Sequence, residues 1–219
     1  MDGNRRWAKK RGLPSSAGHK AGFDHIPDVL KICRDAGIHV VSVYCWSTEN
    51  WNRSKEEVDY IMNSLVTHLP RFARELDEKG VRFIHSGRRK EIPANALKEL
   101  DDAVVLTKQN DKDILNFCFN YGGRAELVES VRNLMQKNTP SESITEESIS
   151  NNLWGNNLPD VDIVIRTGGD QRLSNFMLWQ SSHAFIHIIN RYWPDISRKD
   201  IIDGIKYYND QQYLRFCNL

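Results

Sequence analysis

The stretch "VDIVIRTGG" (residues 161–169) places an apolar, β-branched run directly before an arginine, a threonine and two glycines. A short uninterrupted apolar run that ends at glycine is typical of a strand buried on both faces, as strands of parallel sheets are. Glycines at the carboxyl end of such a strand allow the backbone to turn sharply and to approach a ligand. Arg166 and Arg172 flank this turn, which indicates that the ligand is an anion.

Strand-like and helix-like segments alternate along the rest of the chain. Strands are expected from β-branched and aromatic runs, and helices from apolar residues spaced three or four positions apart. The expected strands cover 38–46, 81–87, 114–123, 161–169 and 184–190. The expected helices cover 24–36, 47–80 with a bend at Pro70, 94–110, 125–137, 145–153, 176–180 and 198–216. The alternation predicts an α/β fold in one domain, residues 1–219, with a mostly parallel central sheet flanked by helices.

Length and composition limit the class of protein. A chain of 219 residues with 40% hydrophobic residues can form a core that needs no disulfide or structural metal. Thirty basic and 29 acidic residues give a net charge of +1, so we expect no nucleic-acid partner. No apolar run reaches the roughly 18 to 20 residues of a membrane span, and no signal peptide is recognisable, so we expect a soluble protein without a transmembrane segment. The four scattered cysteines form no C-x-x-C pair, which favours reduced thiols and a reducing compartment.

Four polar or glycine-rich stretches lie where strands are expected to end, at residues 1–8, 47–53, 120–124 and 166–174. The carboxyl ends of parallel strands meet at one edge of a sheet, so we expect these stretches to converge there. Each stretch alone is more simply explained as a turn or a solvated charge pair. Together they would gather the candidate site residues Asp2, Asn4, Arg5, Arg6, His19, Glu49, Asn50, Arg53, Arg166, Arg172 and Ser174.

The chemistry of this set points to a diphosphate. Guanidinium groups match phosphate oxygens in bidentate geometry, and a carboxylate among so many cations is best explained by Mg²⁺, with Asp2 as its ligand. Neither G-x-x-x-x-G-K-[ST] nor G-x-G-x-x-G is present, which argues against a nucleoside triphosphatase and a dinucleotide-binding protein. Aromatic residues near the same stretches are either ordinary core or the lining of an apolar tunnel for a hydrocarbon attached to the diphosphate.

Several motifs resemble, in order, the signature blocks of the cis-prenyltransferases, the family of undecaprenyl diphosphate synthase. These motifs are "MDGNRRWAKKRGLP", "GHKAG", "STENWNRSKEEV", "LNFCFNYGGRAEL", "DIVIRTGGDQRLSNFMLWQ" and "WPD", and they span nearly the whole chain. The resemblance implies a prenyl diphosphate synthase that depends on Mg²⁺ and acts on allylic and isoprenoid diphosphates. It also implies a homodimer in which the sheet and helices of each subunit enclose a hydrophobic tunnel.

The resemblance also implies roles for individual residues. Asp2 would hold Mg²⁺ at the allylic diphosphate, and Asn4 and His19 would assist ionisation or proton handling. The remaining substrate-binding positions divide between two diphosphates. The allylic diphosphate would contact Gly3, Arg5, Arg6, Trp7, Ser47, Glu49, Asn50 and Arg53, and the second diphosphate would contact Arg166, Arg172 and Ser174. Pyrophosphate would leave the allylic substrate, and the double bond of the second substrate would attack the resulting cation.

Two departures from the family pattern affect the second-substrate pocket. Phe185 stands where the family has a glutamate that joins the metal site from the neighbouring subunit, and phenylalanine cannot ligate Mg²⁺. His183 or His187 could stand in for that acid, although a core or partner-facing histidine is the simpler interpretation. The C-terminal Arg-x-Gly of the family is absent from "QQYLRFCNL" (residues 211–219). This asymmetry favours a second allylic substrate, as in lavandulyl diphosphate synthase, which joins two dimethylallyl diphosphates.

Two alternatives are an ordinary head-to-tail Z-prenyl diphosphate synthase that uses isopentenyl diphosphate, and a non-catalytic accessory subunit. The intact Asp-Gly-Asn block at residues 2–4 counts against the accessory subunit. The bulky side chains of Trp46, Phe117 and Phe119 predict a short product. The family has an apolar strand before this block, so we expect that strand upstream of Met1. The expected location is therefore cytoplasmic, or plastid if a transit peptide has been removed.

Overall fold

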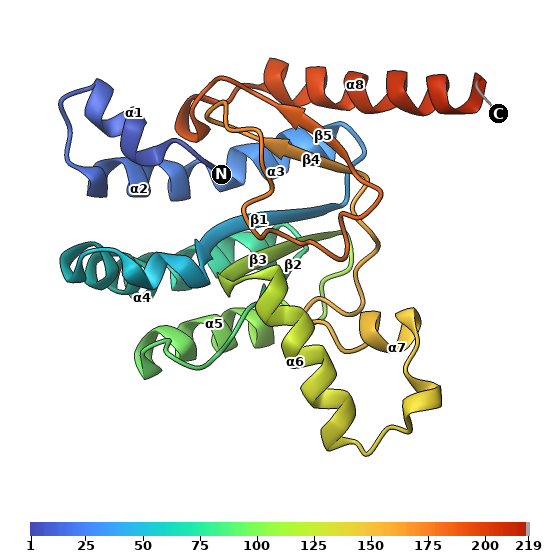
Figure 1. Ribbon diagram of the computed structural model, residues 1–219. Coiled ribbons are helices and arrows are strands. Elements are labelled where there is room, and N and C mark those ends of the chain that lie inside the picture. Colours follow the sequence, from blue (N-terminus) through green and yellow to red (C-terminus); the bar gives the residue numbers. More distant parts are fainter. Residues whose placement is uncertain (218–219) are drawn as a thin grey trace. The chain divides into compact units, whose positions relative to one another are not determined.

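The computed structural model describes the backbone of residues 1–217 and the side chains of residues 1–214. The described chain divides into two compact units, each built from helices and parallel strands (Figure 1). The first unit comprises residues 1–39, 160–173 and those from 180 onward. The second unit comprises residues 40–159 and 174–179.

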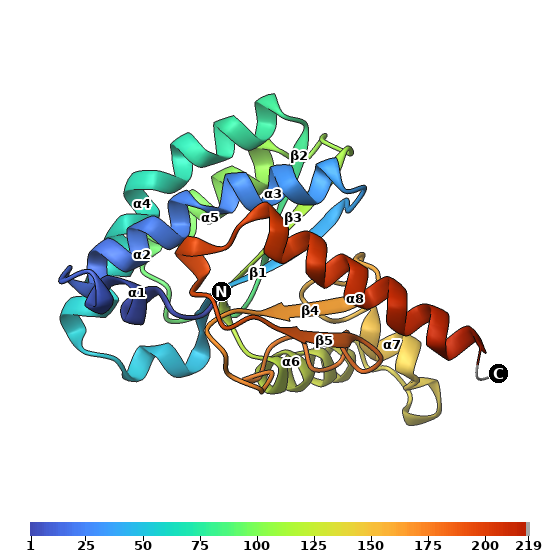
Figure 2. The ribbon, with the colours of Figure 1, turned by 90° about the horizontal axis from the view of Figure 1, so that it is seen from above.

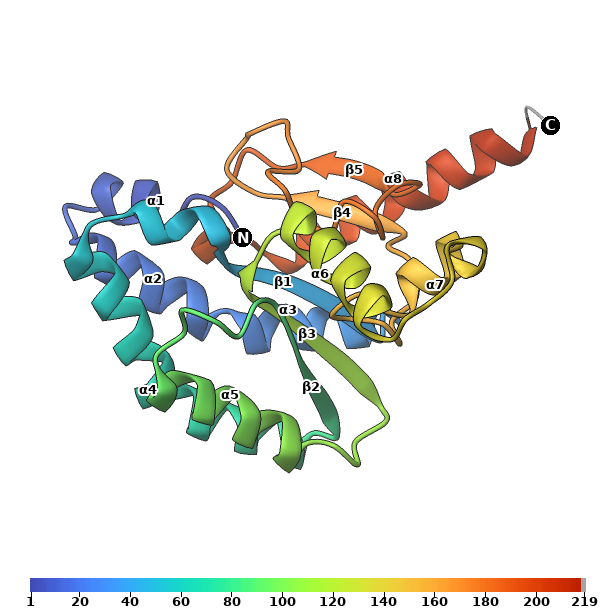
Figure 3. The same cartoon turned by 60° about the horizontal axis from the view of Figure 1, so that its bottom comes forward.

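The second unit contains a parallel sheet with the strand order β1-β3-β2 (Figure 3). Its strands are β1 (Val40–Ser47), β2 (Val81–Ser86) and β3 (Asp113–Tyr121). The central strand β3 is buried along nearly its whole length, as expected for an apolar run paired on both edges. Its last residue, Tyr121, pairs with Ser47, so the polar segments that follow β1 and β3 start at the same edge.

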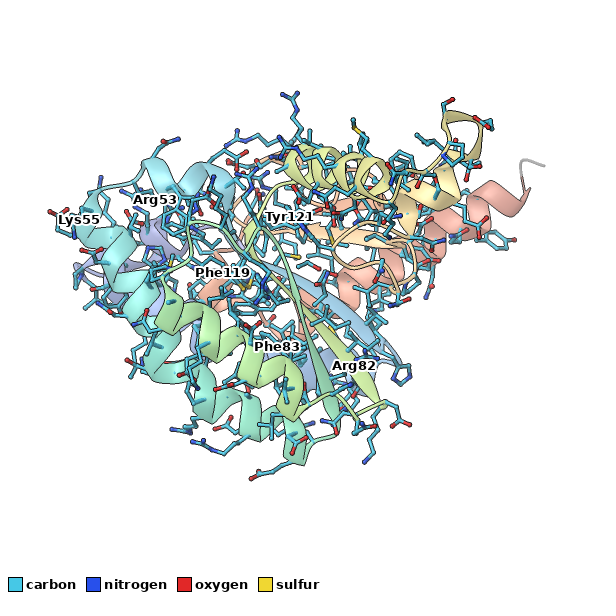
Figure 4. The ribbon with its side chains drawn as sticks, turned by 90° about the horizontal axis from the view of Figure 1, so that it is seen from below. Arg53, Lys55, Arg82, Phe83, Phe119 and Tyr121 are labelled. Carbon is cyan, nitrogen blue, oxygen red and sulfur yellow. The ribbon has the colours of Figure 1, made fainter. Side chains whose placement is uncertain are left out.

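Helices surround this sheet. They are η1 (Thr48–Asn52), α4 (Lys55–Glu78), α5 (Ala94–Leu106), α6 (Gly123–Gln136), η2 (Ser141–Ser143) and α7 (Glu146–Ser150). The buried face of α4, with Leu65, Leu69 and Phe72, carries the apolar spacing of an amphipathic helix, and α4 contacts both α5 and β2. In Figure 4, Arg53 lies near the start of α4 and on the side of the sheet where β3 ends at Tyr121.

The core of the second unit includes a row of buried aromatic rings. Trp46, Phe83, Phe117 and Phe119 are each no more than 2% exposed. The ring of Phe117 lies 5.3 Å from that of Phe83 and 6.0 Å from that of Phe119, which lies 6.3 Å from that of Trp46. We call these four residues the aromatic row.

The first unit pairs two parallel strands and packs helices around them. Its elements are α1 (Asn4–Lys10), α2 (Ser15–Asp24), α3 (Ile26–Asp35), β4 (Ile163–Arg166), β5 (Phe185–Ile188), η3 (Trp193–Asp195) and α8 (Arg198–Cys217). The strands pair in register from Ile163 with Phe185 to Arg166 with Ile188, and α8 contacts both (Figure 2). Helices α1 and α2 pack closely at Gly22. A Cβ atom there would lie only 2.7 Å from the amide atoms of Asn4.

The structure confirms the predicted α/β fold with parallel strands flanked by helices. All five expected strands are present. The helix expected from residue 47 begins only at Lys55, because the Ser54 side chain accepts the Glu57 N–H and caps it, whereas Ser47 caps η1. Pro70 lies inside α4, which continues past it.

One other helix prediction was wrong, and two helices were not predicted. Residues 176–180 form turns, because the left-handed backbone of Ser174, Asn175 and Met177 is incompatible with an α-helix. The N-terminal stretch contains α1 and α2, which were not predicted, because their glycines and basic residues obscure the apolar spacing.

Burial and hydropathy bear on two further expectations. Cys33, Cys45 and Cys118 carry free thiols, and burial raises the pKa of Cys33 to about 11; the side chain of Cys217 lies outside the described ones. None of the described helices combines the length and apolar character needed to cross a bilayer.

Candidate active site

Asp2 is held at the carboxyl end of β4. The hydroxyl of Thr167 accepts a hydrogen bond from the Asp2 N–H at 2.7 Å and donates one to the Asp2 carbonyl at 2.8 Å. The same carbonyl accepts the N–H of Trp193 at 3.0 Å. The Thr167 bonds join residues 165 positions apart in the sequence, so the tertiary structure fixes the backbone of residue 2.

The Asp2 carboxylate lies among donors. Its Oδ1 accepts the Gly3 N–H at 2.6 Å and lies 3.3 Å from the Arg6 guanidinium, while Oδ2 lies 3.1 Å from that of Arg166. Partial burial raises the pKa of this carboxyl, but the Arg166 hydrogen bond, the Arg6 charge and the Gly3 N–H outweigh burial and hold the pKa below its ordinary value. Asp2 is therefore ionised at neutral pH, as a metal ligand must be.

Three guanidinium groups share two carboxylates here. Arg166 bridges Asp2 and Asp170, which lies 3.3 Å away, and Arg172 lies 2.7 Å from the same Asp170 oxygen. Arg166 also donates to the Arg172 carbonyl, and Arg6 donates to the Gly168 carbonyl at 3.0 Å. Three positive and two negative side chains leave an excess of one positive charge, which suits an anionic ligand.

The glycines of this turn act differently from the prediction. The N–H groups of Gly168 and Gly169 were expected to approach the anion, but they donate to the carbonyls of Arg191 and Ile189. Gly168 is required for two other reasons: its φ of 84° is left-handed, and a Cβ atom there would lie 2.5 Å from the Arg6 guanidinium. The arginine side chains of this turn, rather than its glycine N–H groups, therefore stay the predicted anion-binding groups.

Asn4 and Trp7 lie on α1. The Oδ1 atom of Asn4 is buried, and among the described residues no donor reaches it. A buried acceptor without a partner is costly and calls for an explanation, such as a bound ligand, an ion or a water molecule. Trp7 instead donates its indole N–H to Asp195 at 2.7 Å, and its ring lies 4.3 Å from the guanidinium of Arg11.

The other N-terminal candidates differ in their surroundings. Arg5 is exposed, and its role in substrate binding stays a prediction. His19 lies on α2, the helix that packs against α1. Its role in proton handling also stays a prediction.

In the second unit, η1 carries the candidates that follow β1. The Asn50 side chain accepts the Ser47 N–H at 3.2 Å and so completes a capping box. Arg53 forms an ion pair with Glu57 at 2.7 Å, and its guanidinium lies 5.4 Å from the ring of Trp46. Ser47 and Asn50 thus shape the turn that delivers Arg53.

Asn175 joins three segments of the second unit. Its side chain donates to Glu49 at 2.8 Å and accepts the Arg124 N–H at 2.9 Å, while its carbonyl accepts the Gly123 N–H at 2.8 Å. Burial raises the pKa of Glu49, but the Asn175 amide and neighbouring donors outweigh burial and lower it. Asn175 therefore caps α6 and anchors the exposed neighbour Ser174, whose φ of 50° is also left-handed.

The structure brings the four polar stretches together in pairs. Residues 1–8 meet 166–172 in the first unit, and residues 47–53 meet 120–124 and 174–175 in the second. Convergence of all four stretches stays a prediction, as does the tunnel. Three residues with clear contacts to this set were missed, Thr167, Asp170 and Asn175. All three lie in the quoted motif "DIVIRTGGDQRLSNFMLWQ", and Asp170 is four residues from Arg166, which is a signal for an ion pair.

The donor set fits Mg²⁺ in one specific manner. Within the described residues, no group of three or more His, Cys, Asp or Glu side chains could hold a metal ion. Asp2 supplies an ionised oxygen ligand, as Mg²⁺ requires when it is held by one or two carboxylates and otherwise by phosphate and water. The residues therefore fit an ion that is bound together with a diphosphate.

Phe185 occupies the start of β5. Its ring meets that of Tyr208 edge to face at 5.8 Å, and Tyr208 donates to Asp162 at 3.2 Å. His187, two residues on, lies against Tyr207 at 5.3 Å between ring centroids. The other departure, the missing Arg-x-Gly, falls partly on residues 215–219, whose side chains lie outside the described ones.

Comparison with known proteins identifies the family. The undecaprenyl diphosphate synthase family model, Prenyltransf, matches residues 1–216. The chain belongs to the cis-prenyltransferase family. An isoprenyl transferase from Fusobacterium nucleatum is 41% identical over 97% of this chain and 91% of its own length.

Two further cis-prenyltransferases are informative. A trans,polycis-polyprenyl diphosphate synthase from Thermobifida fusca, specific for (2Z,6E)-farnesyl diphosphate, is 41% identical over 97% of this chain and 78% of its own length. The crystal structure of lavandulyl diphosphate synthase from Lavandula x intermedia, in complex with dimethylallyl diphosphate, matches with a TM-score of 0.89 and 29% identity over 95% of this chain and 92% of that chain.

These relatives establish the class of reaction. The chain is a prenyltransferase of the prenyl diphosphate synthase type, which leaves the accessory-subunit alternative without support. The two sequence relatives described above are bacterial, so they lend no support to the plastid alternative.

Proposed function

We propose that this cis-prenyltransferase joins two molecules of dimethylallyl diphosphate into a short, branched diphosphate of the lavandulyl type. The observation that carries the proposal is Phe185, an apolar residue where the family pattern has a metal-binding glutamate. An acceptor pocket without that acid is poorly suited to the ordinary second substrate. The similarity to a lavandulyl diphosphate synthase bound to dimethylallyl diphosphate supports the same substrate here.

The donor diphosphate is assigned to the N-terminal loop. Asp2 would hold Mg²⁺, and Gly3, Arg5 and Arg6 would contact the phosphate oxygens. A role of Arg53 at the same diphosphate is proposed from the family resemblance. Magnesium, when bound, would neutralise the charge that develops on the departing diphosphate. The unpartnered Oδ1 of Asn4 supports its participation, because a substrate or water donor would satisfy it. We place His19 as the group that handles the proton.

The acceptor diphosphate is assigned to Arg166, Arg172 and Ser174. The Arg172 side chain is 68% exposed and therefore accessible to a ligand, whereas that of Arg166 is 13% exposed and held by two carboxylates. Arg172 is thus the group most able to reorient toward the incoming diphosphate. We further propose that the active enzyme is a homodimer of single-domain subunits, as the family resemblance implies.

Product length is assigned to the aromatic row. Large rings at Trp46, Phe117 and Phe119 leave little room for a growing hydrocarbon beside the sheet. A short product follows if the hydrocarbon extends toward these rings. The rings also pack as an ordinary core, so the product itself must be measured.

A second candidate is an ordinary head-to-tail Z-prenyl diphosphate synthase that uses isopentenyl diphosphate. The 41% identity to bacterial isoprenyl transferases favours it. Under this candidate Phe185 is a tolerated substitution.

Product analysis separates the two candidates. The purified protein would be incubated with Mg²⁺ and dimethylallyl diphosphate, with and without isopentenyl diphosphate. A branched ten-carbon product from dimethylallyl diphosphate alone is expected. A linear Z-product that appears only with isopentenyl diphosphate would establish the second candidate, and absence of product in every incubation would contradict both.

Substitution of Phe185 tests the cause. The Phe185→Glu protein should gain activity with isopentenyl diphosphate, because the acid restores a metal ligand. Phe185→Gln is the matched control, since glutamine has the same size as glutamate and also removes the ring but adds no charge. An acceptor preference that is unchanged in Phe185→Glu, or equally changed in both variants, would exclude the lost ligand as the cause.

A further inference from the structure

We propose that Thr167 is a positioning residue that sets the orientation of Asp2 for Mg²⁺ and the donor diphosphate. The inference rests on the proposed role of Asp2 as the metal ligand. It concerns a different group, a hydroxyl that contacts no reacting atom. The expected consequence of removing it is a weaker response to Mg²⁺ from an otherwise folded protein.

Three consecutive residues at the end of β4 form hydrogen bonds to three parts of the N-terminal loop. Arg166 binds the Asp2 carboxylate at 3.1 Å, Thr167 binds both backbone polar groups of Asp2, and the Gly168 carbonyl accepts from Arg6 at 3.0 Å. Among these contacts, Thr167 alone acts on the backbone from which the carboxylate projects. A backbone held on both sides cannot rotate without breaking a bond, so the point from which the carboxylate projects is fixed, while Gly3 and Arg166 hold the carboxylate itself.

The chemistry of threonine suits this task. A hydroxyl can donate one hydrogen bond and accept two, so one Oγ1 atom can serve both the N–H and the carbonyl of residue 2. The Thr167 residue is 1% exposed, so water competes poorly for these bonds. Its β-branched side chain has restricted χ1 rotamers, which keeps the hydroxyl directed at Asp2.

Loss of the Thr167 hydroxyl would remove some of the bonds that hold Asp2 and leave others in place. The Asp2 carbonyl would keep the Trp193 N–H, and the carboxylate would keep Gly3 and Arg166. The Asp2 N–H would lose its bond to Thr167 and would face an apolar group in Thr167→Val. The loop should therefore stay attached but turn, which is the behaviour expected of a lost positioning contact.

Thr107 provides a matched control in the second unit. It is 0% exposed, and its hydroxyl accepts the Phe83 N–H at 2.9 Å and donates to the Ala103 carbonyl at 2.9 Å. The hydroxyl therefore also accepts one backbone N–H and donates to one backbone carbonyl when buried, but it contacts no residue assigned to the metal or to a diphosphate. Thr107→Val should lower the melting temperature as Thr167→Val does, without affecting the binding of Mg²⁺ and the donor analogue.

The experiment compares the full-length Thr167→Val, Thr167→Ser and Thr107→Val proteins. The readouts are the melting temperature, kcat, and the Mg²⁺ concentration that gives half-maximal binding of dimethylallyl thiolodiphosphate, an unreactive donor analogue. For Thr167→Val we expect that concentration to rise and kcat to fall by about 10- to 100-fold. Thr167→Ser should stay near wild type, and Thr107→Val should lower only the melting temperature.

Two results would overturn the inference. One is an Mg²⁺ response of Thr167→Val equal to that of Thr107→Val at a similar melting temperature. If Thr167→Val cannot be purified, Thr167→Ala takes its place, because alanine leaves space for water at the Asp2 N–H. Binding of the analogue by Thr167→Ala at the wild-type Mg²⁺ concentration is the second result that would overturn the inference. Asp2→Asn tests the proposed metal ligand separately from the role of Thr167. An unchanged Mg²⁺ response in that variant would show that Asp2 does not hold the metal.

Discussion

Two arginines assigned to diphosphate binding, one in each unit, are both paired with carboxylates, but the pairs differ in kind. Arg53 lies just before α4, in extended backbone next to the N-cap Ser54, and pairs with Glu57 in the first turn of that helix. Arg166 pairs with Asp2, which is 164 positions away, and with Asp170. The first pair joins residues only four positions apart at the start of a helix, whereas the second exists only because β4 and the N-terminal loop meet.

The difference teaches which arrangement can change on binding. The Arg53 pair joins only neighbouring parts of the chain, so a diphosphate can recruit Arg53 by taking the place of one carboxylate. The Arg166 cluster is supported by Thr167, Gly168 and Trp193, and its charges hold each other in place before any ligand arrives. We therefore regard the first unit as the preorganised part of the enzyme and Arg53 as the adaptable part.

The largest effect is expected from Asp2→Asn. Removal of the charge should lower kcat by about 100- to 1,000-fold, because the departing diphosphate loses electrostatic stabilisation. Steady-state turnover at saturating Mg²⁺ measures this. Asp24→Asn is the control, since Asp24 forms an exposed i,i+4 pair with Lys20 and should leave kcat unchanged. Near-normal turnover of Asp2→Asn would remove the preorganised carboxylate from the mechanism.

Arg172→Ala and Arg53→Ala test whether the two regions serve different diphosphates. Dimethylallyl thiolodiphosphate should bind in two events, as donor and as acceptor. Each variant should weaken one event by about 10- to 100-fold, the value of a lost charged hydrogen bond, and the two variants should weaken different events. Calorimetric titration measures both. Arg71→Ala serves as the control, because Arg71 forms an exposed i,i+4 pair with Glu75 on α4. Weakening of the same event by both variants would mean that the pockets are misassigned.

A moderate effect is expected from Asn175→Gly. Glycine keeps the left-handed backbone but removes the cap of α6 and the contact with Glu49, so the free energy of unfolding should fall by about 1–2 kcal/mol. Urea unfolding measures the change. Asn138→Gly is the matched control, because Asn138 has a φ of 52° at the opposite end of α6 and is exposed. Equal losses in the two variants would show that the Asn175 side chain contributes nothing specific.

The smallest effect concerns acid stability. The folded state holds the pKa of the Asp2 carboxyl below its ordinary value, so the ionic contribution of Asp2 is fully present above the unfolded-state pKa and is lost as the pH falls through the folded-state pKa. Between pH 5 and about 2, stability should therefore fall more steeply for wild type than for Asp2→Asn. Urea unfolding across this range measures the slopes. Identical slopes would mean that Arg6 and Arg166 do not stabilise the charge.

Local sequence patterns were sufficient for much of the fold. β-branched and aromatic runs identify β1, β2 and β3, because such side chains suit a buried pleated surface regardless of their neighbours. The segment 176–180 misled the same reasoning. Its apolar residues look helical, but the left-handed Ser174, Asn175 and Met177 are stabilised by contacts with distant segments, including Glu49 and Gly123.

Composition and motifs within short windows were enough to indicate the family, the alternating α/β architecture and the residue types of the site. Three contacts depend instead on how the chain folds. Thr167 bonds the backbone of Asp2, Arg166 is shared by Asp2 and Asp170, and the Gly168 and Gly169 amides bond carbonyls of residues 189–191. The physical reason is distance along the chain. A hydrogen bond between residues 165 positions apart leaves no periodic signal, because it depends on how separate elements pack.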